Sequence, residues 1–291
     1  MSGQAWERRP RWMSAALYVS AGLLAALAVG PGLWLVLGAL QPAGHAVGMP
    51  LDQVINDDTG ALTQPATWFT GDNFARAWKD GGLARPIMNS IIATLARAGL
   101  CVLLAALAAY PLARMDFPGR KVLFMVVLAT MMVPEQVIVI PMFRITAGLG
   151  MYDSLLGVVM PFSVSAFGIY LCRQAFAQVP DSLEEAAVID GASSLRIWWS
   201  VMLPLTRPTL ATLALFSVIF AWSDLLWPLV ILQSPEQYTL PVAINGLLGT
   251  FSTNPRVAYA ASVLALVPIV VVFLAVQRFM SPNMFAGSVK G

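Results

Sequence analysis

Charged and chemically reactive residues are scarce in this chain. Only 11% of its 291 residues are charged while 58% are hydrophobic, and the mean hydropathy is +0.74, far outside the usage of soluble globular domains. The two cysteines, Cys101 and Cys172, both lie in apolar runs, which argues against a disulfide framework or a thiolate metal site. The single histidine, His45, cannot build a metal cluster alone. The composition therefore predicts an integral membrane protein.

Six apolar runs are long enough to cross the hydrocarbon core, which takes about 20 mostly apolar residues. They are residues 15–40, 86–110, 122–143, 154–176, 209–232 and 257–279. The first run is too long for the core of a signal peptide, so we expect it to be retained as a helix. Prolines within the runs predict kinks or broken turns: Pro31, Pro134, Pro161, Pro228 and Pro268. The fold class predicted is an all-α membrane protein with six transmembrane helices.

The distribution of Lys and Arg predicts that both termini lie in the cytoplasm. With the N-terminus inside, the inner segments carry 11 of the 17 basic residues and the outer segments carry five, while Arg97 falls within a span. Short loops rich in Lys and Arg stay on the cytoplasmic side. The chain then divides into a cytoplasmic N-terminus (1–14), a first transmembrane helix (15–40), a periplasmic loop (41–85), a core of five transmembrane helices (86–279) containing a cytoplasmic loop (177–208), and a cytoplasmic tail (280–291).

The outer loop after the first span is of mixed polarity. Its Pro, Gly and Asp clusters predict a loop-rich elaboration with one short helix around Asn73 to Lys79. Asp57 and Asp58 are adjacent carboxylates without a full ligand loop, so we expect them to be solvated and not to bind a cation. A second outer loop, 233–255, has an apolar middle, which is consistent with a segment that dips toward a pore or touches a partner.

The cytoplasmic loop contains the stretch EEAAVIDGASSLRIWWSVMLPLTRP, residues 184–208. Ser182 followed by Glu185 is a capping-box pattern, which predicts that a short helix begins there. Gly191 ends that helix and permits a sharp change of direction. A second helix, capped by Ser193 or Ser194, then carries a predicted amphipathic stripe that ends at Pro204; the stripe is formed by Leu195, Trp198, Trp199 and Met202.

Two interpretations of this helix pair follow from its residues alone. One is an interfacial pair on the inner leaflet, with its tryptophans at the depth of the headgroups. The other is a rigid docking element, whose alanine-rich face is presented to a cytoplasmic protein. Physical chemistry by itself leaves both open.

The spacing of the loop resembles a known motif. Glu185-Ala186-Ala187, three residues, Gly191, nine residues and then Val201-Met202-Leu203-Pro204 is similar to the EAA loop of ABC importer permeases, with valine where isoleucine is usual. Further stretches resemble the carbohydrate importers of the maltose-type group, specifically the shorter partner of their heterodimeric pore: NSIIATLARAG, AAYPLARMDFPGR, VPEQVIVIPMF, GMYDSLLGVVMPF, AWSDLLWPLVIL, YTLPVAI and GSVKG.

The resemblance implies a type I ABC importer permease fold with cytoplasmic EAA coupling helices. It implies four kinds of partner: a second, homologous permease, two ATP-binding subunits, an external substrate-binding protein and membrane lipid, with no nucleic acid. It also assigns Glu185, Ala186, Ala187, Gly191, Leu203 and Pro204 to coupling with the ATPase. Glu184 is expected to be a solvated neighbour, and the C-terminal NMFAGSVKG is either a tail that reaches the ATPases or a frayed end.

The chain lacks the G-x-x-x-x-G-K-[ST] pattern of a phosphate-binding loop. We therefore expect MgATP to bind the partner ATPase and this chain to hold no cofactor and no metal. With one histidine and no paired carboxylates or nucleophile–base set in the spans, the sequence also predicts a subunit that is not an enzyme.

Arg97 and Asp224 lie within predicted spans, where each charge costs on the order of 3 kcal/mol on insertion scales. Asp224, Trp222 and Trp227 are candidates for the translocation pathway, since a carboxylate accepts hydrogen bonds from sugar hydroxyls and aromatic faces stack on sugar rings. The interpretation we favour is structural, with Arg97 and Asp224 serving as an ion pair or hydrogen bond between helices. An ion-coupled secondary transporter that uses Asp224 and Arg97 as a proton relay is the alternative function.

Overall fold

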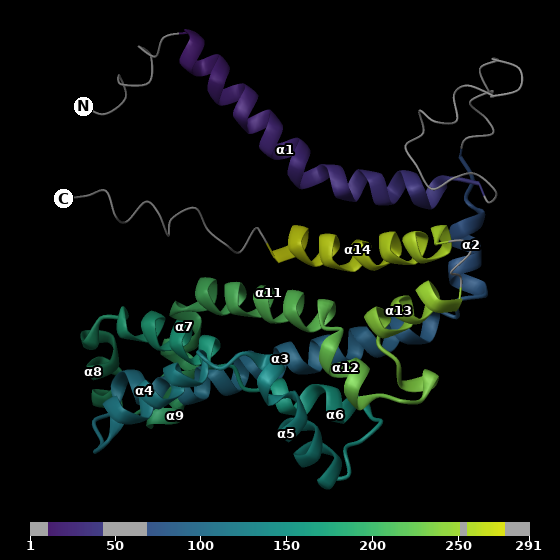
Figure 1. Ribbon diagram of the computed structural model, residues 1–291. Coiled ribbons are helices and arrows are strands. Elements are labelled where there is room, and N and C mark those ends of the chain that lie inside the picture. Colours follow the sequence, from purple (N-terminus) through teal and green to yellow (C-terminus); the bar gives the residue numbers. More distant parts are fainter. Residues whose placement is uncertain (1–10, 43–68, 251–254, 277–291) are drawn as a thin grey trace, which may run out of the picture. The chain divides into compact units, whose positions relative to one another are not determined.

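The computed structural model describes residues 11–42, 69–250 and 255–276. Within these ranges all regular secondary structure is helical, as predicted (Figure 1). The chain divides into two compact units, Met1–Gly82 with Gly246–Leu264, and Leu83–Asn245 with Ala265–Gly291. Three segments of the sequence predictions fall largely or wholly outside the described residues: the N-terminal segment, the part of the outer loop that holds His45 and Asp57-Asp58, and the tail 280–291.

Among the described residues, three helices are individually long and apolar enough to cross a membrane. They are Leu17–Leu40, within α1 (Arg11–Leu40), together with α3 (Ala84–Arg114) and α14 (Arg256–Val276). Three further candidates are pairs of helices bent at a short break: α4 (Arg120–Thr130) with α5 (Glu135–Gly148) at 101°, α6 (Leu155–Val159) and the 3-10 turn Met160–Phe162 with α7 (Ala166–Ala177) at 46°, and Ser194–Leu205 with α11 (Arg207–Ser223) at 81°. The segment Ser194–Leu205 contains α9 (Ser194–Ile197) and α10 (Leu203–Leu205). The other α-helices in the described ranges are α2 (Asp72–Lys79), α8 (Asp181–Ile189), α12 (Leu226–Ile231) and α13 (Leu240–Thr250).

Prolines mark the breaks in three of the predicted runs. Pro134 directly precedes α5 at the 101° bend, and Pro161 lies in the 3-10 turn before α7. The run 209–232 is not one helix, because α11 ends at Ser223 and Asp224 is extended. Pro228 has no N–H to donate to the carbonyl of Asp224, so one hydrogen bond of the helical ladder is missing at the junction of α11 and α12. The two other prolines, Pro31 and Pro268, lie inside α1 and α14.

The core of the larger unit forms around α3, which packs along α7 and α11. Small residues permit this close approach: a Cβ placed on Gly168 of α7 would lie 3.0 Å from Cβ of Ala105 and 3.2 Å from Cδ1 of Leu213. Both cysteines are free and buried in this cluster, as plain packing predicts. The core therefore holds the middle and the Arg114 end of α3 against two neighbouring helices.

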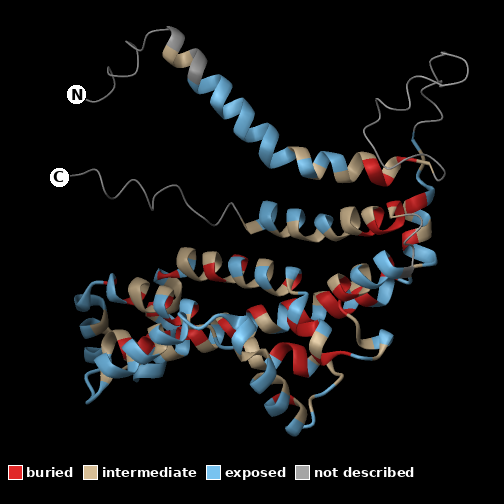
Figure 2. Cartoon of the chain, viewed as in Figure 1, coloured by how far each residue is buried: buried red, intermediate tan, exposed pale blue. Residues whose placement is uncertain are grey.

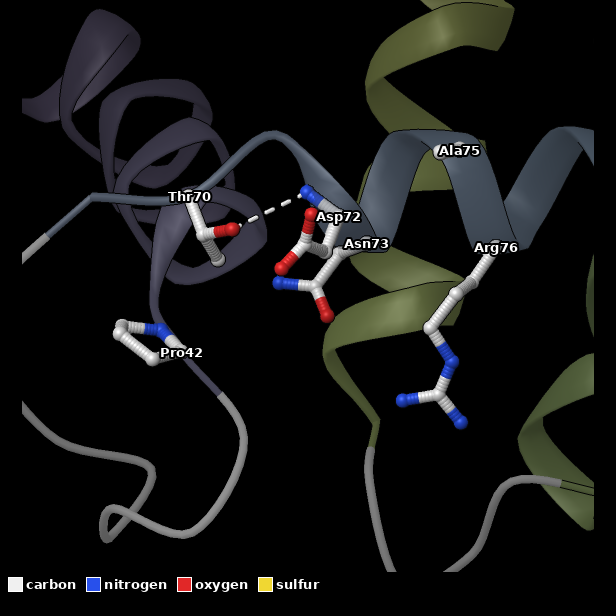
Figure 3. Close-up of a pocket in the computed structure, with 6 residues that line it drawn as sticks. All are labelled: Pro42, Thr70, Asp72, Asn73, Ala75 and Arg76. Atoms are coloured by element: carbon white, nitrogen blue, oxygen red, sulfur yellow. Dashed lines mark hydrogen bonds between the residues drawn. The ribbon is translucent and has the colours of Figure 1, made fainter.

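The smaller unit contains the short helix predicted in the outer loop, which is α2. Asn73 is buried at its start, and its side-chain amide donates hydrogen bonds of 2.8 Å to the carbonyl oxygens of Ala39 and Gln41. This amide therefore satisfies carbonyls at the C-terminal end of α1, which a helix leaves unpaired. Figure 3 shows a hollow beside it, where Thr70 accepts a hydrogen bond from the backbone N–H of Asp72. Figure 2 shows α1 itself exposed over most of its described length.

Candidate docking helix and the groups that hold it

The first helix of the EAA-like loop is α8, and no residue in it is buried (Figure 2). It begins at Asp181, directly after Pro180, whose extended backbone precedes the first turn. Ser182 is thus inside the helix and caps nothing, so the predicted capping box is wrong. Asp181 and Glu184 occupy the first turn, where carboxylates are favoured by the helix dipole.

Gly191 ends α8 as predicted. Its φ of +76° is in the left-handed region that a side chain disfavours. The backbone N–H of Gly191 bonds to the carbonyl of Val188, and that of Ala192 reaches back to Ala187, both at 2.9 Å, which closes the helix with the paired bonds of a Schellman motif. Ser193, one of the two predicted caps, accepts from the N–H of Arg196 and starts α9.

The predicted apolar stripe of the second helix is wrong. Trp198 and Met202 are buried, but Leu195 and Trp199 are each 65% exposed. Residues Trp198–Met202 form a π-helical turn between α9 and α10. A π turn holds more residues than an α turn, so the three-and-four spacing no longer keeps these side chains on one face.

The structure separates the residues assigned to ATPase coupling. Glu185 and Ala186 are exposed, as is the Gly191 turn. Ala187 is half-buried and packs against the core. Leu203 and Pro204 are half-buried, and Leu203 also packs on the core. Coupling by all six stays a prediction, and the members of this set that a partner can reach are Glu185, Ala186 and Gly191.

Glu184 is not a solvated neighbour, contrary to the prediction. Its Oε1 accepts a 2.8 Å hydrogen bond from the hydroxyl of Tyr110, and its Oε2 lies 3.6 Å from Nε of Arg114. Both partners belong to α3, so adjacent glutamates have opposite environments. One residue of rotation along α8 turns Glu184 inward to α3 and Glu185 outward.

Arg97 and Asp224, from the second and fifth predicted spans, are in contact. Nη1 of Arg97 donates a 2.8 Å hydrogen bond to Oδ2 of Asp224, and the guanidinium lies 4.6 Å from the ring centroid of Phe162. The other carboxylate oxygen accepts from the backbone N–H of Trp227 at 3.4 Å and caps the start of α12. The predicted structural ion pair is confirmed.

The two pathway candidates beside Asp224 are packed residues in this structure. The indole of Trp222 donates to the carbonyl of Ala265 at 3.1 Å, and that of Trp227 donates to the carbonyl of Gly157 at 2.9 Å. Both side chains are buried. Contact of Trp222, Asp224 or Trp227 with a transported molecule stays a prediction.

Two structurally important residues were missed in the sequence. Arg114 binds α7 and α8 from the end of α3, and a basic residue in the last turn of a helix was its only local signal.

Asp153, the one non-glycine residue with positive φ among those described, joins the α5–α6 connection to the segment after α12. Its carboxylate accepts hydrogen bonds from the N–H groups of Gln233 and Ser234 and from the Ser234 hydroxyl. These bonds, the hydroxyl's foremost, lower the pKa of Asp153 below its ordinary value.

The chain belongs to the family described as "Binding-protein-dependent transport system inner membrane component", which it matches over residues 101–286. It is 30% identical to the arabinooligosaccharides transport system permease protein AraQ of Bacillus subtilis (strain 168), over 92% of this chain and 93% of the relative. It is 31% identical to the sn-glycerol-3-phosphate transport system permease protein UgpE of Yersinia pestis, over 85% of this chain and 90% of the relative.

Two solved structures of bacterial ABC transporters have chains with a similar fold. A chain of a bacterial ABC transporter involved in the import of the acidic polysaccharide alginate superposes with a TM-score of 0.78 and 25% identity, covering 94% of this chain and 98% of that chain. The bacterial alginate ABC transporter in complex with an alginate pentasaccharide-bound periplasmic protein also shares the fold, with a TM-score of 0.63 and 16% identity over 97% and 98% of the two chains.

Proposed function

We propose that this chain is a permease subunit of an ATP-driven, binding-protein-dependent importer of sugars, polyols or sugar phosphates. The observation that carries the proposal is the presentation of α8: Glu185 and Ala186 face outward while Glu184 and Ala187 face the core. A small residue lets a partner surface approach the helix closely, and an exposed carboxylate can pair with a partner's cationic side chain. The sugar and glycerol-phosphate relatives support the substrate class.

The proposed arrangement has six membrane spans with both termini in the cytoplasm. The bent pairs α4 with α5 and α6 with α7 each count as one span. In the third pair α11 is the membrane part, and Ser194–Leu205 belongs to the cytoplasmic loop. The basic residues are more numerous in the inner segments. Two contacts within the larger unit agree with the way the segments are grouped on opposite sides, whichever side is inner. Arg114 joins α3 to α7 and α8 in the segments assigned to the cytoplasm, and Asp153 joins the two segments assigned to the outside.

The partners proposed are a second, homologous permease that completes the pore, two ATPase subunits that bind MgATP and dock on α8, and a soluble protein that delivers the substrate outside. This chain supplies half of the pore and performs no chemistry of its own. The structure of a related transporter with its substrate-loaded periplasmic protein supports the last of these partners.

Uptake by proteoliposomes that contain the complete complex tests the function. We expect accumulation of a labelled sugar that requires ATP and the binding protein, with candidate sugars chosen by thermal shift of that protein. Glu185→Lys should abolish uptake while the chain still inserts, because it reverses the charge on the exposed face of α8. Asp116→Lys, which makes the same charge change at a 98% exposed carboxylate, is the matched control and should transport normally.

Two results would contradict the proposal. Uptake driven by a pH gradient without ATP would favour the ion-coupled alternative that uses Asp224 and Arg97. Normal transport by Glu185→Lys, with the ATPase bound, would remove Glu185 from the docking surface.

A further inference from the structure

The last residue of α3 holds the end of α7. The side chain of Arg114 is only 8% exposed, and its Nε and Nη2 donate to the carbonyl of Phe176 at 3.1 and 2.6 Å. Nη2 also donates to the carbonyl of Val179, in the turn that follows α7. Carbonyls at the C-terminal end of a helix have no intrahelical donor and carry partial negative charge, so a buried guanidinium satisfies both requirements.

The same guanidinium holds the first turn of the docking helix. Its Nη1 pairs with Asp181, and its Nε lies 3.6 Å from Oε2 of Glu184. Tyr110, one turn earlier in α3, binds the other oxygen of Glu184. The Tyr110 ring is itself fixed edge-on against the fully buried Phe176, with centroids 6.4 Å apart. Glu184 is thus held from two sides.

A second contact attaches the other half of the loop to the same helix. The indole of Trp198, buried in the core, donates to the carbonyl of Ala106 at 3.2 Å. Both helical segments that flank Gly191 are therefore bound to α3 within about one turn of Tyr110. A displacement of α8 relative to α3 would break partly buried charged hydrogen bonds, which are costly to leave unpaired.

At a second point along its length, α3 contacts the break in the fifth predicted span. Arg97 lies 17 residues before Arg114, which is about 25 Å along a helix at 1.5 Å per residue. There it pairs with Asp224 at the junction of α11 and α12. One continuous helix, α3, therefore connects the docking helix to the bend that Asp224 caps.

We infer that Arg114 and Tyr110 are positioning residues that make α3 and α8 a single body, through which movement of the docking helix reaches the Arg97–Asp224 pair. This inference rests on the proposed function. The clamp formed by Tyr110, Arg114, Asp181 and Glu184 stays closed throughout the transport cycle. When the clamp is lost, more ATP is hydrolysed for each sugar transported, while the exposed docking face is kept.

The ratio of ATP hydrolysed to sugar transported measures this coupling. We expect Arg114→Gln and Glu184→Gln to raise that ratio about tenfold, within the usual range of coupling free energies. The matched control is Arg120→Gln, which removes a cation near the same end of α3 whose partner, Asp116, is exposed; its ratio should equal that of the wild type. Equal losses of hydrolysis and uptake in the clamp variants, with an unchanged ratio, would overturn the inference.

A crosslink tests the clamp without depending on the stability of those variants. Tyr110→Cys with Glu184→Cys is introduced into a Cys101→Ala, Cys172→Ala background, which removes the two native thiols. A short bis-methanethiosulfonate reagent then bridges the introduced pair. Before bridging, we expect the double-cysteine variant to hydrolyse more ATP per sugar transported than the cysteine-free background. After bridging, we expect this ratio to return to the value of the background.

The outcomes of this experiment are distinct. Bridging that stops uptake would show that α3 and α8 must separate, and bridging that leaves the pair uncoupled would show that their attachment is not the transmission; either result overturns the inference. A wild-type complex without ATP-driven uptake would contradict the proposed function itself and the inference with it.

Discussion

Arg97 and Asp224 form an ion pair between the middle of α3 and the break that separates α11 from α12. Their side chains are 12% and 17% exposed. A charge that is mostly removed from water needs its partner, whereas a well-packed apolar pair needs none. The pair therefore fixes which segment of the chain lies beside α3 at this depth.

Removing one member of this pair should cost more than removing both. We expect Arg97→Met to lower the free energy of unfolding by about 3 kcal/mol, because Asp224 is left without its cation. Arg97→Met with Asp224→Leu should recover most of that loss. Thermal unfolding in detergent measures both. Arg120→Met, which removes an ion pair whose carboxylate is 98% exposed, should cost at most about 1 kcal/mol. Additive losses in the double variant would show that the two charges are not coupled.

Trp227 and Trp199 should respond differently to the same substitution. Trp227→Phe leaves the carbonyl of Gly157 without its donor in a site that is 2% exposed, so we expect a loss of about 1–3 kcal/mol in unfolding free energy. Trp199 is 65% exposed, and Trp199→Phe should change stability by about 0.5 kcal/mol or less. If Trp227→Phe keeps full stability but changes sugar selectivity, the residue belongs to the pathway and its packing role is minor.

The Asp153 contact should make stability depend on pH in the acidic range. The pKa of this carboxyl is lowered from 3.8, mainly by the hydroxyl of Ser234. Its contribution is therefore fully present above pH 3.8 and is lost as the pH falls through the lower value of the folded state. We expect the difference in melting temperature between wild type and Asp153→Asn to be constant from about pH 5 to pH 7 and to shrink below about pH 4. A difference that grows on acidification would contradict the assignment.

The turn at Gly191 should discriminate between substitutions by backbone preference alone. No heavy atom outside the neighbouring residues lies within 4 Å of a Cβ built there, so the φ of +76° is the only obstacle. Gly191→Val should cost about 1–2 kcal/mol and reduce the ATPase response to the binding protein, whereas asparagine, which tolerates this region, should cost less. Equal behaviour of the two variants would mean that the turn geometry is unimportant for coupling.

Local features of the helix pair at residues 181–208 were only partly predictable. Gly191 acts within its own turn, so its position in the sequence was sufficient. The cap of the second helix was narrowed to Ser193 or Ser194, and the structure shows that it is Ser193. The start of α8 was placed too late, because Pro180 sets the extended residue and leaves Ser182 inside the helix. The stripe failed because a π turn changed the angular spacing. The EAA-like motif is read from the spacing of residues in the sequence, so these local errors do not affect it.

The sequence by itself determined the membrane class, the positions of the apolar runs and the family-like loop, because these depend on composition and on spacing along the chain. Only the tertiary structure decided which of two adjacent glutamates faces α3, and only it showed that Arg97 and Asp224, 127 residues apart, lie close enough to form the predicted ion pair. Such contacts depend on how helices pack and where they break. Glu184 is held because it lies beside the buried Arg114. Glu185, the next residue of the helix, is exposed and can bind a partner.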